Sequence, residues 1–114
     1  MREDGKIDYV EFPCTDLPST RRFYEAAFGW RFAEYGPTYL AFENAGLDGG
    51  FQGNPAAAPA RPLVVVFTRA LEAMLTTVER AGGTITVPIF QFPGGRRFHF
   101  RDPAGNELAV WSET

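Results

Sequence analysis

The chain has 114 residues and a formal net charge of −3, with 45% hydrophobic and 22% charged residues. This length suits one domain, and the composition is that of a globular protein, which excludes a disordered tail. The longest apolar run, Leu63 to Phe67, is far shorter than the roughly 20 residues that span a bilayer, so we expect no membrane partner. Because nucleic-acid binders carry a basic surface, we expect no nucleic-acid partner either.

The N-terminus and the cysteine content predict a cytoplasmic protein. No apolar stretch with a small-residue cleavage site follows the charged first six residues, so we expect no signal peptide. Cys14 is the single cysteine, which excludes an internal disulfide and leaves either a small buried filler or a reactive thiol. The 11 Phe residues raise the aromatic content to 15%, which predicts a dense core or a ligand pocket.

The first half of the chain predicts a strand, a helix and three more strands. Apolar residues alternate before Pro13, Asp16 is typical of a helix cap, and Gly29 is typical of a helix end. Gly36 and Pro37 separate two alternating segments, which indicates a hairpin. The expected elements are a strand over 7–12, a helix over 17–29, and strands over 30–35, 38–42 and 47–52.

The second half predicts the same order of elements. A stretch with three prolines, residues 53–62, has the composition of a linker. After it, apolar residues recur at helical spacing from Leu71 until Gly82 and Gly83. The expected elements are strands over 63–67, 84–87, 97–100 and 107–111, with a helix that begins near 71 and ends before 82.

Landmarks in the two halves are evenly spaced. Leu71 follows Leu17 by 54 positions, and Gly83 follows Gly29 by the same 54. Gly105 follows Gly46 by 59, because the second hairpin is longer. Equal spacing at separate landmarks indicates an internal repeat.

Three motifs, in this order, resemble the vicinal oxygen chelate superfamily, which includes glyoxalases, bleomycin-resistance proteins and extradiol dioxygenases. They are Asp16 to Tyr24 followed by Phe28-Gly29-Trp30, then Ala81-Gly82-Gly83, and finally Asp102 to Leu108. The resemblance implies an α+β fold with two βαβββ modules in tandem, forming a curved, mostly antiparallel sheet with a cleft and with helices on the outer face. It also implies a homodimer. The single domain would comprise module 1 over about 6–53, a linker over 54–61 and module 2 over about 62–113.

The superfamily's enzymes commonly bind one divalent metal through four strand positions, and here these positions hold poor ligands. Counting from the motifs places them at Tyr9, Gly50, Leu63 and Ala109. A divalent metal needs His, Glu or Asp side chains from different strands. We therefore expect no metal at these positions and no other cofactor.

Strand alternation predicts which side chains face the cleft. With Tyr9, Leu63 and Ala109 facing inward, Glu11, Val65, Phe67, Glu107 and Trp111 do so as well, because residues two apart share a face. The opposite set is wholly apolar and suits packing against the helices: Val10, Phe12, Val64, Val66, Leu108 and Val110. If Phe98 and Phe100 belong to the core, then Arg97, His99 and Arg101 lie on the other side.

These residues supply the candidates for chemistry. His99 titrates nearest neutrality and would be a general acid or base, with Glu11 and Glu107 as paired carboxylates. The alternatives are a structural, hydrogen-bonded His99 and carboxylates that are solvated or bridged to Arg97 or Arg101. A displaced divalent-metal site made of Glu11, His99 and Glu107 is a further alternative. The expected ligand-binding residues are Tyr9, Phe67, Phe90, Arg97 and Trp111.

Three functional classes follow. The first is a metal-independent protein that binds a small molecule between aromatic side chains. The second is a lyase, isomerase or dioxygenase-like enzyme that uses Glu11, His99 and Glu107, with or without a displaced metal. The third is a module that dimerises or binds another protein.

Overall fold

The computed structural model describes residues 2–114 and divides into two compact units. The first unit is Tyr9–Leu63, and the second unit is Val64–Thr114 together with the segment that ends at Asp8. Each unit has one helix and strands of mixed direction, which confirms the predicted α+β class and the repeated order of elements. Neither helix within residues 2–114 is long and apolar enough to span a membrane.

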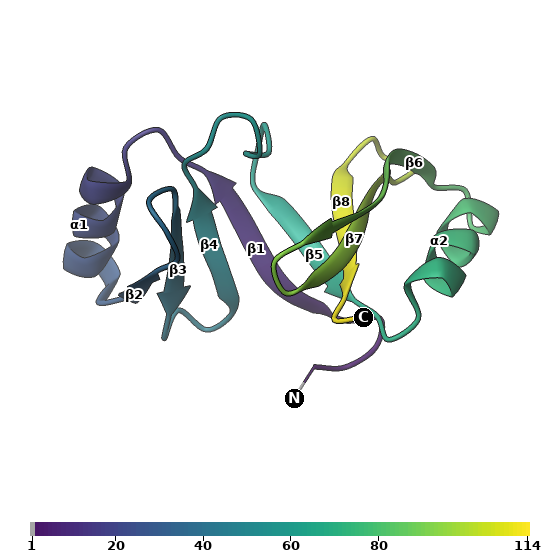
Figure 1. Cartoon of the computed structure of the whole chain (residues 1–114), viewed down its shortest axis with the longest axis horizontal. Coiled ribbons are helices and arrows are strands. Elements are labelled where there is room, and N and C mark those ends of the chain that lie inside the picture. Colours follow the sequence, from purple (N-terminus) through teal and green to yellow (C-terminus); the bar gives the residue numbers. More distant parts are fainter. Residues whose placement is uncertain (1) are drawn as a thin grey trace. The chain divides into compact units, whose positions relative to one another are not determined.

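The first unit places its strands in the order β2-β3-β4-β1 (Figure 1). Strand β4 pairs in parallel with β1 from Tyr9 to Pro13 and antiparallel with β3, which in turn pairs antiparallel with β2. The elements are β1 (Ile7–Pro13), α1 (Leu17–Phe28), β2 (Arg31–Glu34), β3 (Tyr39–Glu43) and β4 (Asp48–Gln52).

The second unit repeats this arrangement with the order β5-β8-β7-β6 (Figure 1). Strands β5 and β8 are parallel, and the two remaining pairs are antiparallel. The chain before β1 pairs with the end of β5, where Phe67 N–H donates to Lys6 O and Gly5 N–H donates to Phe67 O. The elements are β5 (Leu63–Phe67), α2 (Leu71–Arg80), β6 (Thr84–Phe92), β7 (Gly95–Arg101) and β8 (Glu107–Ser112).

Helix α1 begins and ends where the sequence predicts. The Asp16 carboxylate accepts the Ser19 N–H at 3.1 Å, so it satisfies one of the first backbone donors of the helix. Gly29 follows the helix with φ 73°, a left-handed conformation that is inexpensive only for glycine. Helix α2 has no side-chain cap at Ala70, and it ends at Arg80, with Ala81 between it and the predicted glycines.

Each helix covers one face of the strands in its own unit. In the first unit, Leu17 and Tyr24 of α1 pack with Phe12 against a buried cluster of Leu40, Phe42 and Phe51. In the second unit, α2 packs against Phe98 and Val110, with Val66 and Phe100 beside them. The predicted assignment of Phe12, Val66, Phe98, Phe100 and Val110 to the helix-facing side is therefore confirmed.

The prediction for the second hairpin was wrong in length. Strand β6 runs on to Phe92 and β7 begins at Gly95, so both strands extend almost to the turn. Strand β6 contains Pro88, and proline lacks the N–H that a central strand requires. Strand β6, however, lies at an edge, and its register with β7 shifts on both sides of Val87, which accommodates the proline.

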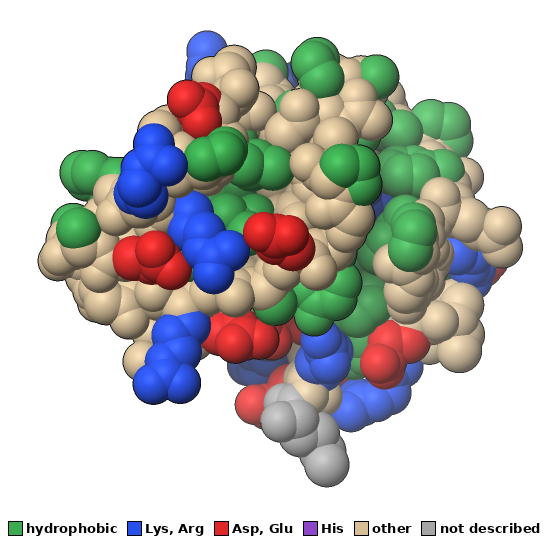
Figure 2. Space-filling model, turned by 60° about the vertical axis from the view of Figure 1, so that its left-hand side comes forward, with side chains coloured by type: hydrophobic (Ala, Val, Ile, Leu, Met, Phe, Trp, Pro, Cys, Tyr) green, Lys and Arg blue, Asp and Glu red, His purple; other side chains and the backbone are tan. Residues whose placement is uncertain are grey.

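Several aromatic side chains lie at the surface of the first unit. Phe23, Phe28 and Tyr35 are all more than half exposed, and Phe23 contacts Phe28 edge-on at 6.4 Å. The face drawn in Figure 2 shows hydrophobic side chains in several places, interspersed with acidic and basic ones. The aromatic content therefore fills a core and also leaves rings exposed.

The close approach of β4 to its neighbours predicts that Gly49→Ala destabilises the protein. A Cβ at Gly49 would lie 2.2 Å from the Val10 carbonyl oxygen and 2.2 Å from the Phe42 ring. Backbone cannot move aside as a side chain can, so we expect a loss of about 3 kcal/mol in the free energy of unfolding. Urea unfolding measures it. Gly53→Ala is the control, since its nearest atoms lie at 3.1 Å or more; equal losses in the two variants would contradict the prediction.

Candidate functional site

The polar candidates of the second unit share the face of its strands that α2 does not cover, here called the distal face. In the register of β7 and β8, Arg97 lies opposite Trp111, His99 opposite Ala109, and Arg101 opposite Glu107. Strand alternation places these residues on the side away from Phe98 and Val110, as predicted. His99 and Glu107, two of the three predicted catalytic residues, are thus brought together.

His99 and Glu107 form a hydrogen-bonded pair that continues to a third residue. His99 Nδ1 lies 3.3 Å from Glu107 Oε2, and the Thr86 hydroxyl donates to the same oxygen at 2.9 Å. A carboxylate beside Nδ1 favours the tautomer that carries its proton there, leaving the lone pair on Nε2. Thr86 was missed by the sequence analysis, because nothing marks a threonine on β6 until the register of β6 with β7 is known.

The other ring nitrogen of His99 is buried without a hydrogen bond. Within residues 2–114 no partner lies near His99 Nε2, although the atom is shielded from solvent. Burial lowers the pKa of His99 below its ordinary 6.5, and the nearby positive charge of Arg97 lowers it further. The Glu107 carboxylate raises the pKa of His99, but burial and Arg97 together lower it by more. At neutral pH the imidazole is therefore uncharged.

Aromatic rings and Arg97 surround His99 on the distal face. The Phe90 ring centroid lies 5.8 Å from that of His99, and Arg97 Cζ lies 5.3 Å from the Phe90 ring. Further along the strands, Trp111 packs edge-on against Phe67 at 5.4 Å. Four of the five predicted ligand-binding residues, Phe67, Phe90, Arg97 and Trp111, therefore belong to the second unit.

Trp111 is also held by the segment that precedes β1. Its indole N–H donates to Asp8 Oδ1 at 3.1 Å, and Arg2 Cζ lies 5.0 Å from the Trp111 ring. Arg2 and Asp8 themselves form an ion pair at 3.1 Å. Neither residue was a candidate, because only the tertiary structure places the start of the chain beside its last strand.

The first unit has a polar cluster of its own, which contains Tyr9 and Glu11. The Tyr39 hydroxyl donates to Glu11 Oε2 at 3.2 Å and also contacts the Tyr9 hydroxyl. Burial and the nearby Tyr9 and Glu11 raise the pKa of Tyr39, which stays protonated. Sequence analysis missed Tyr39, whose position suggested only a hairpin strand.

The four strand positions that would hold a metal do not fit one. A Cβ at Gly50 would lie 2.5 Å from the Tyr39 ring, so the space for a ligand side chain there is already filled. Leu63 and Ala109 are apolar and buried, and the Tyr9 hydroxyl is bonded to Tyr39. Phenol, methyl and isobutyl groups are not usual ligands for a divalent cation.

The displaced three-residue metal site stays a prediction. In the part of the chain that the structure describes, no three His, Cys, Asp or Glu side chains are grouped closely enough to hold a metal ion. His99 and Glu107 belong to the second unit, and Glu11 belongs to the first. Glu11 accepts from the Tyr39 hydroxyl, and Glu107 contacts the Thr86 hydroxyl and the His99 imidazole.

Two other sequence features have structural explanations. Cys14 is partly buried beside the core of the first unit, with Sγ 3.2 Å from the Thr20 hydroxyl, as expected for a small filler. The Asp102 carboxylate accepts the Asn106 N–H at 2.9 Å, which closes the predicted turn before β8.

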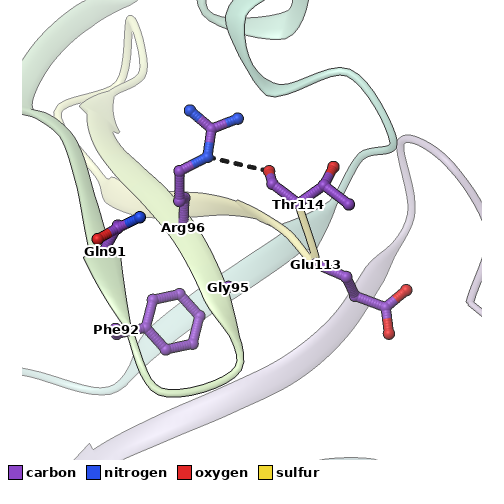
Figure 3. A pocket seen from close by; sticks show the side chains of 6 residues that line it. All are labelled: Gln91, Phe92, Gly95, Arg96, Glu113 and Thr114. Carbon is purple, nitrogen blue, oxygen red and sulfur yellow. Dashed lines mark hydrogen bonds between the residues drawn. The ribbon is translucent and has the colours of Figure 1, made fainter.

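A shallow hollow lies near the C-terminus in the second unit (Figure 3). Arg96 spans it, donating from Nε to the Thr114 carbonyl at 3.0 Å and pairing with Glu72 of α2 at 2.6 Å. None of the predicted site residues lines it; the lining residues are Gln91, Phe92, Gly95, Arg96, Glu113 and Thr114. Arg96 is therefore engaged in contacts with Thr114 and Glu72.

The chain is similar to known proteins in both sequence and fold. A family model described as Glyoxalase/Bleomycin resistance protein/Dioxygenase superfamily matches residues 6–110. No curated protein matches the chain significantly.

Solved structures share the fold at low sequence identity. A glyoxalase/bleomycin resistance protein/dioxygenase superfamily member from Vibrio splendidus 12B01 is 14% identical with a TM-score of 0.73, covering 95% of this chain and 98% of that chain. Methylmalonyl-CoA epimerase from Mycobacterium tuberculosis is 12% identical with a TM-score of 0.71, covering 94% and 87%. The Mn(II)-bound glyoxalase from Novosphingobium aromaticivorans is 18% identical with a TM-score of 0.68, covering 99% of this chain and 40% of that chain. At these identities the likeness shows the fold alone.

The first unit's cluster predicts that Tyr39→Phe destabilises the protein. Glu11 is only 5% exposed, and the variant leaves its carboxylate with one donor fewer. We expect the free energy of unfolding to fall by about 1–3 kcal/mol, the usual cost of removing one partner of a buried polar group. Urea unfolding measures it, with Tyr35→Phe as the control because Tyr35 is 65% exposed. A Tyr39→Phe protein as stable as the control would contradict a stabilising hydrogen bond from Tyr39 to Glu11.

The lowered pKa of His99 predicts a stability that depends on pH just below 6.5. The unfolded chain binds a proton on this imidazole near pH 6.5, whereas the folded protein binds it only at lower pH. Between those two values the unfolded state carries more protons, so the free energy of unfolding rises with pH. His99→Gln should lack this slope when unfolding is followed by tryptophan fluorescence between pH 5 and 7.5.

Four carboxyl groups with a lowered pKa titrate below this pH range. Their pKa values lie below the ordinary 3.8 or 4.5, so their contribution to stability is lost only in more acid solution: Asp4, Asp16, Glu72 and Asp102. Identical slopes for the wild-type and His99→Gln proteins between pH 5 and 6.5 would contradict the lowered pKa.

Proposed function

Because the chain belongs to the glyoxalase/bleomycin resistance protein/dioxygenase superfamily, we propose that it binds a small organic molecule and does so without a divalent metal at the superfamily's four strand positions. The observation that carries this proposal is the set of residues at those positions. Gly50 is covered by the Tyr39 ring, and the other three side chains are not metal ligands. The homodimer and the cytoplasmic location expected from the sequence stay predictions.

The distal face of the second unit has the chemistry of a site for a flat ligand. Its partly exposed rings are Phe90, beside His99, and Trp111, which packs against the buried Phe67. Aromatic side chains contribute large contact areas at low entropic cost, and a few polar groups then fix the orientation of the ligand. The unpartnered Nε2 of His99 is such a group, because a buried nitrogen without a hydrogen bond costs about 1–3 kcal/mol that a ligand atom can recover.

We expect 2-naphthol, a flat aromatic molecule whose hydroxyl group can donate to His99 Nε2, to bind in the presence of a chelator. Phe90→Leu keeps apolar volume but removes the ring, so affinity measured by calorimetry should fall about two- to tenfold, the value of an aromatic contact. Phe23→Leu is the matched control, since Phe23 is 57% exposed on α1 of the first unit. Elemental mass spectrometry of the same protein, purified without chelators, should find no stoichiometric metal.

Two results would overturn this proposal. One is near-stoichiometric divalent metal that is lost in a His99→Ala protein, which would establish the displaced metal site instead. The other is 2-naphthol binding that is undetectable, or that is weakened equally by Phe90→Leu and Phe23→Leu, which would place the ligand surface elsewhere.

A further inference from the structure

Residues 2–8, here called the strap, lead into β1 and are bound to the second unit. Gly5 N–H donates to Phe67 O at 2.7 Å, and Phe67 N–H donates to Lys6 O at 2.9 Å. Figure 1 shows this purple segment beside the end of β5, the strand that Phe67 completes. The middle of the strap is therefore attached through its backbone.

The Asp4 side chain provides a second attachment. Its Oδ1 accepts the Thr68 hydroxyl at 2.9 Å and the Arg69 N–H at 2.7 Å. Both hydrogen bonds hold the pKa of Asp4 below its ordinary 3.8, because they favour the charged carboxylate. Thr68 is only 1% exposed, so Asp4 is bound to a residue that is itself firmly held by the fold.

Beyond this attachment, the Arg2 side chain lies over Trp111. Arg2 Cζ is 5.0 Å from the centre of the ring, within the range of a cation–π contact. Asp8 holds both partners, because its Oδ2 pairs with Arg2 Nε at 3.1 Å and its Oδ1 accepts the Trp111 indole N–H at 3.1 Å. The Arg2 carbonyl also accepts from Arg69 Nη2 at 3.1 Å. The position of Arg2 is thus defined by several contacts.

The contact with Arg2 occupies a face of the Trp111 indole. The two aromatic neighbours of Trp111 approach it at steep angles, Phe67 at 67° and Phe92 at 53°, so neither ring stacks flat on it. Trp111 is one of the partly exposed rings of the distal face. A flat ligand that stacks on this ring therefore needs the place that the Arg2 guanidinium occupies.

The two ends of the strap are held with unequal strength. The Asp4 carboxylate binds the buried Thr68, as described above. The Arg2 side chain, in contrast, is 42% exposed, and an ion pair at such a position contributes little stability because water and salt screen it. The Arg2 end can consequently detach while the Asp4 end stays bound.

We propose that the strap is an autoinhibitory device, in which Arg2 lies over Trp111 and must move away before a flat ligand can stack on that ring. This proposal rests on the small-molecule site proposed above and states how access to it is controlled. Asp4, Gly5 and Lys6 keep the strap attached, so Arg2 returns to Trp111 when the ligand leaves. The observed affinity is reduced in proportion to the fraction of molecules whose ring is uncovered.

The test is the affinity of an Arg2→Ala protein for 2-naphthol. This variant removes the guanidinium and leaves Asp8 bonded to the Trp111 indole N–H. We expect the affinity measured by calorimetry to rise about two- to fivefold over the wild-type value, which corresponds to a partly exposed cation–π contact. Arg80→Ala is the matched control, because it removes the same side chain from an exposed position on α2 in the same unit.

Fluorescence quenching by acrylamide examines the strap without any ligand. Removing Arg2 uncovers the Trp111 ring, so quenching should be stronger in Arg2→Ala than in the wild-type and Arg80→Ala proteins. The other tryptophan, Trp30, packs in the first unit and contributes equally in all three proteins. Equal quenching in the three proteins would overturn the inference, whether or not a ligand binds.

The binding results separate this inference from the proposed function. If 2-naphthol binds the wild-type and Arg2→Ala proteins equally well, Arg2 does not control access, and the binding proposal stands. If Arg80→Ala strengthens binding as much as Arg2→Ala does, the effect is one of net charge and the inference is overturned as well. If 2-naphthol binds none of the three proteins, both proposals fail.

Discussion

The alternation of side chains along each strand is the constraint on which the rest of this structure depends. One face of the strands in each unit is covered by that unit's helix, and the side chains that fill this layer are almost all apolar. A polar group there would lose its water without gaining a partner, at a cost of some kcal/mol. Tyr9, Glu11, His99 and Glu107 are consequently confined to the other face. The helices thus determine where chemistry is possible.

The two units use that face in different ways. In the first unit, the Tyr39 hydroxyl is hydrogen-bonded with Tyr9 and Glu11. The Tyr39 ring also fills the space beside Gly50. In the second unit, His99 has Glu107 on one nitrogen and none of the described residues on the other. Hydrogen bonds within a buried cluster stabilise the fold. A buried nitrogen without a hydrogen bond destabilises it, and such a group is retained where a ligand can supply the missing hydrogen bond. The second unit is therefore the better candidate for a ligand-binding site.

Membership of the superfamily and the absence of its usual ligand residues are compatible, because a fold does not specify a reaction. Solved structures with this fold include a Mn(II)-bound glyoxalase and a methylmalonyl-CoA epimerase, at 18% and 12% identity to this chain. What a βαβββ module provides is strands whose alternate residues point to one side.

The sequence alone determined the repeated order of elements, the ends of α1 and the division of side chains between the two faces. These features depend on local rules: Asp16 and Gly29 act on their own helix, and alternation needs no partner strand. Only the tertiary structure decided which polar residues meet. Thr86 lies where the register of β6 with β7 shifts and contacts Glu107, Tyr39 reaches Glu11 across β4, and Asp8 reaches Trp111 from the segment before Tyr9. Such contacts depend on strand pairing between distant segments, and the residues themselves carry no sign of it.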